Sequence, residues 1–241
     1  MNARIESVEP ALAASRADQA LGQIAVQLPG ATAVFRRLKL DFCCGGQLSL
    51  RQAALDKQLD LVAVLEELAG LERGSELPVA TNAAALIDHI LARYHAVHRT
   101  QLPELIRMAR RVEAVHREHP DVPAGLAQLL EAIEAEMLEH MEKEEGILFP
   151  MLKAGGNPFV VHPIAMMRSE HISHGAQLDR LNALTYDASP PAGACNTWCA
   201  LYSGIAQLND DLINHIHLEN NVLFPQFEVA TGVETGCGCS A

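Results

Sequence analysis

The sequence predicts an all-α protein, in which an up-down four-helix bundle follows a small helical domain with a Cys-Cys pair. Aromatic residues make up only 4% of the 241 residues, while Ala, Leu and Glu, which favour helices, are abundant. Hydrophobic residues make up 49%, which is enough for a packed core. The C-terminal part also consists of two related halves, and each half has the apolar spacing of two helices.

The small domain is expected over residues 17–72. It contains the run Phe42-Cys43-Cys44-Gly45-Gly46, and two short helices are expected after it at 50–56 and 61–71. Residues 70–81 include glycine, serine and proline and are expected to form a linker. We expect residues 1–16 and 229–241 to be mobile tails.

The bundle is expected over residues 81–228, with prolines and glycines between its helices. The apolar periodicity predicts helices over 82–119, about 126–150, from about 158 to a loop at 186–193, and about 197–223. Pro103 lies inside the first of these and is expected to bend it, because proline cannot donate to the preceding turn.

A motif repeats in the second and fourth of these helices. Residues 140–150 and 215–225 both read His-x-x-x-Glu-x-x-Ile/Val-Leu-Phe-Pro, at an offset of 75 residues. Another histidine precedes each copy, His95 by 45 residues and His171 by 44. The repetition favours a functional role over six unrelated buried or surface side chains.

The spacing of these residues predicts a two-metal site. Residues four apart lie on one face of a helix, so the His and Glu of each motif point the same way. If the helices carrying the upstream histidines pack against them, four imidazoles and two carboxylates meet in the core. The predicted ligands are His95, His140, Glu144, His171, His215 and Glu219.

The ligand set indicates which metals such a site would take. If both glutamates bridge, each metal receives two nitrogens and two oxygens. A solvent-derived oxo or hydroxo bridge makes five ligands and leaves one position open for a small molecule. Imidazole with bridging carboxylate suits iron or manganese better than structural zinc, which prefers closed thiolate-rich sites.

Three further acids are candidates for hydrogen bonds to the imidazoles or for an iron route, the alternative being a solvated helix face. They are Glu136 and Asp211, four residues before His140 and His215, and Glu170, beside His171. Seven other histidines are interpreted as non-ligands without counterparts in the repeat: His89, His98, His116, His119, His162, His174 and His217.

The two His-x-x-x-Glu motifs with their upstream histidines resemble a hemerythrin-like di-iron domain, although an oxygen-carrying hemerythrin has one histidine more. With the run Asp41-Phe-Cys-Cys-Gly-Gly46, the stretch 94–105 and Lys143-Glu-Glu145, the chain resembles the iron-sulfur cluster repair family of RIC or YtfE/ScdA type. The resemblance covers about residues 20–227.

This resemblance implies a function. It also implies that the six predicted ligands bind two non-haem iron ions and that the glutamates bridge these ions. Such proteins help to restore iron-sulfur clusters damaged by nitric oxide or peroxide, by supplying iron. Damaged or apo iron-sulfur proteins would then be the partners, with nitric oxide or oxygen as small ligands. Binding, scavenging or reducing nitric oxide is the alternative, and whether the protein is a turnover enzyme stays open.

The cysteines leave several alternatives open. Cys43 and Cys44, where the family has its cysteine pair, could be a redox pair, ligands during iron transfer, a contact of a homodimer, or part of a structural turn. Cys195 and Cys199 lie four apart beside Trp198 and are interpreted as buried core residues. The pattern does not decide the role of Cys237 and Cys239.

Charge and hydropathy exclude other classes of function. The net charge of −12 argues against binding nucleic acid, which needs clustered Lys and Arg. No targeting segment or membrane span is expected, so a cytoplasmic protein with reduced thiols is the default.

Overall fold

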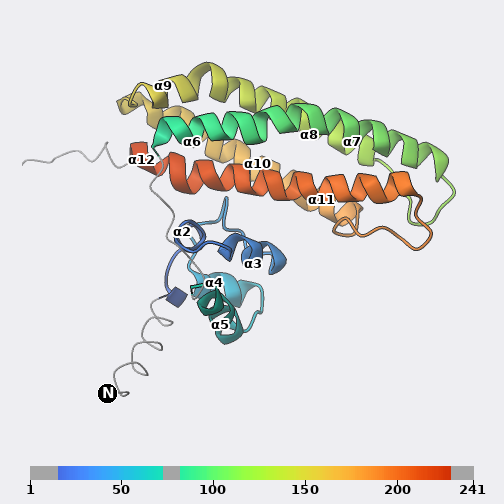
Figure 1. The fold of residues 1–241 in the computed structure, drawn as a ribbon, viewed down its shortest axis with the longest axis horizontal. Coiled ribbons are helices and arrows are strands. Elements are labelled where there is room, and N and C mark those ends of the chain that lie inside the picture. The colour runs from blue at the N-terminus through green and yellow to red at the C-terminus, as the bar shows by residue number, and fades with distance from the viewer. Residues whose placement is uncertain (1–15, 73–81, 229–241) are drawn as a thin grey trace, which may run out of the picture.

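The computed structural model describes residues 16–72 and 82–228, and all of the regular structure in these ranges is helical apart from one isolated bridge between Ala20 and Ser49. Figure 1 shows a long bundle with a smaller group of helices against one side of it. The predicted all-α class and the four-helix bundle behind a small helical region are confirmed. The expected mobile tails (apart from Arg16), Cys237 and Cys239 lie outside the described residues.

The described residues of the small domain include the short helices α2 (Leu21–Gln27), α3 (Ala31–Arg37), α4 (Leu50–Asp56) and α5 (Leu61–Glu72). Its own core is built from apolar residues of these four helices and of the segments between them. Phe35 of α3 and Phe42 belong to it, and their rings lie 5.8 Å apart. Because α5 continues to Glu72, the first residues of the expected linker are helical.

The first half of the bundle contains two helical runs. The first run is α6 (Ala83–Ile90), the π-helical turn η1 (Leu91–His95) and α7 (Ala96–Val115), with Pro103 inside α7. The second run is α8 (Leu126–Lys143), the π-helical turn η2 (Glu144–Leu148) and α9 (Phe149–Lys153).

The second half repeats this arrangement. Its first run is the short 3₁₀ turn η3 (Pro158–Val160) with α10 (Val161–Leu184). The last run is α11 (Asn196–His217), the π-helical turn η4 (Leu218–Leu223) and α12 (Pro225–Glu228). In the bundle, α7 packs against α8 and α11, while α10 packs against α8 and over a shorter stretch against α11.

The apolar core of the bundle has two separate parts. One is formed by α7, α8, α10 and α11 and surrounds Trp198 and Tyr202. The other, around Phe149 and Phe224, fills the end where α6, α9 and α12 lie. The buried histidines and glutamates of the repeat belong to neither part. Along the chain, both glutamates lie between a residue of one part and a residue of the other, as do His95 and His171, whereas His140 and His215 lie among residues of the first part.

The small domain contacts the bundle chiefly at η4 and α11. Asn220 and Asn221 donate their side-chain amides to the backbone carbonyls of Cys43 and Phe42, both at 3.0 Å. Arg36 forms an ion pair with Asp210 at 3.1 Å. The Cys-Cys run is therefore held against the part of η4 that follows Glu219. None of the helices within the described ranges has the length together with the apolar character of a transmembrane span.

Candidate metal centre

The six residues predicted as ligands meet in the middle of the bundle, and all of them are buried. They form two groups in which one ligand atom of each residue lies within 4.8 Å of the others. One group is His95, Glu144, His215 and Glu219, and the other is His140, Glu144, His171 and Glu219. Both glutamates are common to both groups, as expected for carboxylates that bridge two ions.

The π-helical turns bring three of these residues into place. His95 is the last residue of η1, Glu144 is the first of η2, and Glu219 lies in η4. A π-helical turn inserts a residue into an α-helix and turns the following side chains, and such turns often occur at functional sites. His171 lies in the uninterrupted helix α10.

The four imidazoles point their Nε2 atoms inward. The Nε2 atoms of His95 and His215 are 3.2 Å apart, and those of His140 and His171 are also 3.2 Å apart. A cation bound by both members of a pair would use the lone pairs that face each other there. Each pair therefore offers two nitrogen ligands to one ion.

The carboxylates lie between the two pairs. Glu219 places Oε1 3.1 Å from Nε2 of His215 and Oε2 3.1 Å from Nε2 of His171. Glu144 reaches the other two imidazoles, with Oε2 3.4 Å and 3.5 Å from their Nε2 atoms. Both oxygens of Glu144 are buried without a hydrogen-bond donor. Because buried carboxylates otherwise have partners, the residues present fit a site for two cations.

The electrostatics also favour cation binding. Burial, reinforced by the neighbouring imidazole, lowers the pKa of His95 to about 4 and that of His140 to about 2, so both are neutral near pH 7. Burial and the charge of Glu219 raise the pKa of Glu144 well above its usual value. Burial opposes ionisation of Glu219 too, but His215 and His171 outweigh it and its pKa is well below the usual value.

Three of the imidazoles donate outward through Nδ1. His95 lies 2.7 Å from Glu145 Oε1 and His140 lies 2.8 Å from Glu170 Oε2. His171 lies 2.9 Å from Asn220 Oδ1. These contacts fix the orientation of the rings.

Of the three acids expected around the centre, the structure brings only Glu170 to an imidazole. Glu136 is exposed on α8. Asp211 forms an ion pair with Arg93, with Oδ1 2.6 Å from Nη2. Its carboxylate therefore binds a guanidinium group instead of an imidazole of the centre. Sequence reasoning missed Glu145 and Asn220, although each directly follows a glutamate of the repeated motif.

Two further histidines also follow the repeat, contrary to our interpretation that they have no counterparts. His98 lies three residues after His95, and His174 lies three residues after His171. Both are buried, and neither ring nitrogen of either residue has a hydrogen-bond partner. His98 stacks on His215 with ring centroids 5.6 Å apart, and His174 lies 5.0 Å from His140.

Cys43 and Cys44 lie close to the centre. Their sulfur atoms are 3.7 Å apart, and the Cys44 thiol lies 3.4 Å from the backbone carbonyl of His171. The Cys43 thiol lies 3.3 Å from a carboxylate oxygen of Asp41. The hydrogen bond to Cys44, then burial, raises the pKa of the Cys43 thiol.

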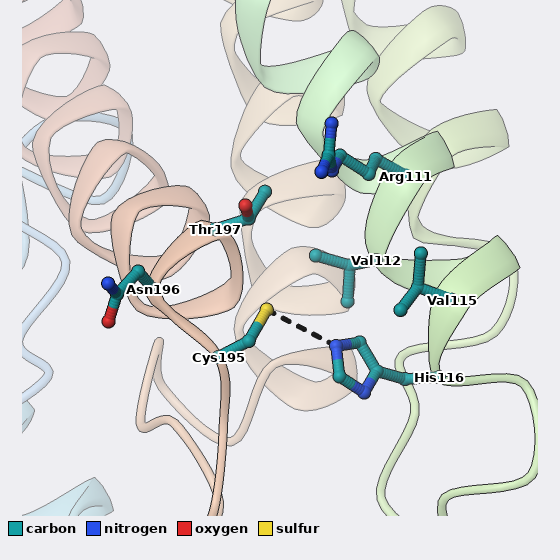
Figure 2. A pocket seen from close by; sticks show the side chains of 7 residues that line it. All are labelled: Arg111, Val112, Val115, His116, Cys195, Asn196 and Thr197. Carbon is teal, nitrogen blue, oxygen red and sulfur yellow. Dashed lines mark hydrogen bonds between the residues drawn. The ribbon is translucent and has the colours of Figure 1, made fainter.

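The interpretation of Cys195 and Cys199 as buried core residues is wrong, because Cys195 is half-buried and Cys199 is exposed. Trp198 fills the core at this end of α11, so Cys199 faces outward. Cys195 directly precedes the helix, and its sulfur lies 3.2 Å from Nε2 of His116 at a surface pocket (Figure 2).

Two family models match the chain. Residues 86–227 match the hemerythrin HHE cation binding domain. Residues 17–72 match ScdA_N, described as a domain of unknown function (DUF542). The buried His and Glu groups thus lie in a segment similar to a cation-binding domain, in agreement with a di-metal site.

The chain is also similar to bacterial proteins named iron-sulfur cluster repair protein YtfE. It is 48% identical to that of Cronobacter sakazakii over 214 residues, which cover 87% of this chain and 96% of the relative. It is 48% identical to that of Dickeya chrysanthemi over 212 residues and 47% identical to that of Escherichia coli O157:H7 over 214 residues, with the same shares of both chains covered.

Proposed function

The chain belongs to the YtfE family of iron-sulfur cluster repair proteins, and from this premise we propose that it repairs damaged clusters by donating iron from the centre in its bundle. The observation that carries the proposal is the pair of four-residue groups that share Glu144 and Glu219. A damaged iron-sulfur protein is the recipient and iron is the cargo.

The six residues of the two groups are proposed to hold two iron ions, linked by an oxo or hydroxo bridge. Each ion would have two imidazole nitrogens and an oxygen from each glutamate. Such nitrogen and oxygen ligands suit iron, which when bound there supplies the ion that the recipient lacks. The neutral imidazoles have their Nε2 lone pairs available near pH 7, since burial lowers the pKa of His95 and His140.

The chemistry of the ligands is compatible with release. Fe²⁺ stands near the weak end of the affinity order of divalent metals, and no thiolate belongs to either four-residue group. Glu144 keeps a raised pKa in the metal-free protein, so a proton can replace the departing cation on this carboxylate.

Cys43 and Cys44 are proposed to take part in the transfer as thiol ligands. With Asp41 they form a cluster of three potential ligands beside His171, at the contact between the small domain and the bundle. This position offers departing iron softer ligands than the centre does. A redox role of the two thiols is the alternative.

We also propose a cytoplasmic location, since all four cysteines among the described residues are free thiols. The recipients are proposed to be enzymes whose cubane clusters have lost one iron through peroxide or nitric oxide.

The experiment is a transfer assay without free iron. The reduced, iron-loaded protein is mixed anaerobically with a dehydratase carrying a [3Fe–4S] cluster, together with one reducing equivalent per cluster. A chelator that intercepts free Fe²⁺ is present. We expect one iron lost from this protein for each [4Fe–4S] cluster regained, as measured by recovered dehydratase activity and metal analysis.

The control is the variant Glu144→Ala/Glu219→Ala, which is incubated with iron in the same way and should restore nothing. Repair that is equally fast with this variant would contradict donation. Repeated reduction of nitric oxide to nitrous oxide with both irons retained would instead support the alternative function.

A further inference from the structure

The repeat makes Tyr94 and Glu170 equivalent residues around the centre. Tyr94 directly precedes His95, and Glu170 directly precedes His171. Each of them contacts an imidazole from the other half of the bundle. Glu170 of the second half contacts His140 of the first half, and Tyr94 of the first half contacts His215 of the second half. The two contacts differ in kind, since one is a hydrogen bond and the other is a ring stack.

On one side, His140 is held by a charged acceptor. Its Nδ1 lies 2.8 Å from Glu170 Oε2, and the other oxygen of Glu170 accepts from Lys143 Nζ at 2.8 Å. The second imidazole of this pair, His171, donates to Asn220. Both imidazoles of this pair therefore have an outer hydrogen-bond partner.

On the other side, His215 has no outer hydrogen-bond partner. The Tyr94 ring stacks flat on it, with centroids 5.3 Å apart and an angle of 1° between the planes, and His98 stacks on it at 5.6 Å. Its Nδ1 is buried and has no hydrogen-bond partner. Its companion His95 donates to Glu145.

The nearest acid in sequence does not supply the missing acceptor. Asp211 lies one helical turn before His215, but both of its oxygens accept from Arg93, at 2.6 Å and 3.1 Å. His215 is thus the one imidazole of the four whose Nδ1 side is held by stacking instead of by an outer hydrogen bond.

Outer hydrogen bonds orient a ligating imidazole and increase its basicity, and losing one typically lowers metal affinity about 10- to 100-fold. We propose that the two metal positions are inequivalent and that the ion held by His95 and His215 is the one that leaves. This inference rests on the proposed iron donation and adds which ion is given up and why.

The test measures release of iron to a strong Fe²⁺ chelator by stopped-flow absorbance, without any recipient protein. The wild-type protein, loaded with two irons, should release them in two phases of one ion each. By the equivalence with Glu170, Tyr94→Gln is expected to offer an amide acceptor to Nδ1 of His215 and should slow the fast phase about 10- to 100-fold. Tyr94→Leu removes the ring without adding an acceptor, so its fast phase should be at least as fast as in the wild type.

Glu170→Leu is the matched variant on the other side. It removes the acceptor of His140 and should accelerate only the slow phase, so that both ions leave at similar rates. If Tyr94→Gln fails to take up two irons, Glu170→Leu alone tests which ion leaves first. An accelerated fast phase with an unchanged slow phase in this variant would show that the ion held by His140 and His171 leaves first.

A single release phase in the wild type, or equal slowing by Tyr94→Gln and Tyr94→Leu, would overturn the inference. The outcome is separate from that of the transfer assay. Two phases with the expected response to the variants but no repair of a damaged cluster would reject donation and leave the inequivalence standing. Repair by a protein that releases both irons in one phase would support donation and reject the inequivalence of the two metal positions.

Discussion

His171 donates through Nδ1 to the amide oxygen of Asn220 across 2.9 Å, and this contact connects the metal centre to the small domain. The amide nitrogen of the same Asn220 donates to the backbone carbonyl of Cys43 at 3.0 Å. One side chain therefore orients a candidate metal ligand and holds the Cys-Cys run in place.

The first prediction compares Asn220 with its neighbour. Asn220→Leu should weaken iron binding about 10-fold or more, because His171 loses its outer acceptor. Asn221→Leu should leave iron affinity unchanged, since Asn221 contacts Phe42 and His217 but no candidate ligand. Equilibrium competition with a chelator measures both. Equal affinity losses in the two variants would show that iron affinity depends on the contact between the domains and not on the hydrogen bond to His171.

The second prediction concerns the two glutamates in the metal-free protein. Burial and the charge of Glu219 raise the pKa of Glu144. Burial also acts on Glu219, but His215 and His171 lower its pKa, so a proton in the metal-free pair favours Glu144 over Glu219. Glu144→Gln should cost less free energy of unfolding than Glu219→Gln, because it replaces a carboxyl that favours its neutral form with a neutral amide of nearly the same shape. Glu219→Gln should cost about 1–3 kcal/mol, because it removes a charged hydrogen-bond partner.

Urea unfolding of both metal-free variants gives the comparison, and metal analysis of the loaded proteins completes it. Both variants should bind fewer than two irons, because each has lost an ionisable bridging group. A Glu144→Gln variant that is the less stable of the two without metal would contradict the assignment of the proton.

Much of the fold and of the centre could be predicted, because the repeat and the helical period act together. His140 and Glu144 lie four residues apart, and so do His215 and Glu219, which fixes a shared face before any tertiary contact is known. The same period identified the four helices of the bundle, whose breaks contain proline or glycine.

The outer contacts could not be predicted in the same way. Neighbouring residues on an α-helix point about 100° apart, so Glu145 and Asn220 were not expected to reach the centre. They do so because their partners, His95 and His171, approach from other helices, and because η2 and η4 are π-helical. The pairing of Asp211 with Arg93 joins residues 118 positions apart, which no local pattern reveals.

The third prediction is a pH dependence of stability that originates at His217. Burial lowers its pKa from 6.5 to about 4, and Asn221 donates to its Nδ1 at 3.0 Å, which a protonated ring would not accept. Below pH 6.5 the unfolded chain takes up the proton and the folded protein does not. The contribution of His217 to the free energy of unfolding is therefore fully present above pH 6.5, falls as the pH drops toward 4, and is lost below that value.

At pH 4.5 the loss from this one group amounts to about 2–3 kcal/mol. His217→Gln keeps an acceptor for Asn221 but does not titrate in this range. Urea unfolding of the two metal-free proteins at pH 7.5 and 4.5 should show the wild type losing about that much more than the variant. Equal losses would place the acid sensitivity in the other buried histidines, such as His98 and His174, whose pKa values burial also lowers.

The last prediction tests the contact between the small domain and the bundle. A Cβ atom on Gly46 would lie 2.5 Å from the backbone oxygen of Phe42 and 2.8 Å from Oδ1 of Asn221. The first of these atoms is backbone and cannot move aside cheaply. Gly46→Ala should therefore destabilise the protein by about 1–3 kcal/mol and push the domain away from Asn221.

Gly70→Ala is the control, because nothing lies within 4 Å of a Cβ there and alanine favours the helix α5. It should be neutral or stabilising in urea unfolding. The Cys44 thiol packs against His171 and Gly175, so loosening the contact in Gly46→Ala should also speed its alkylation by a thiol reagent, while Gly70→Ala should leave that rate unchanged. If Gly46→Ala has the same stability and the same rate of Cys44 alkylation as the wild type, the domains are not held together at this point.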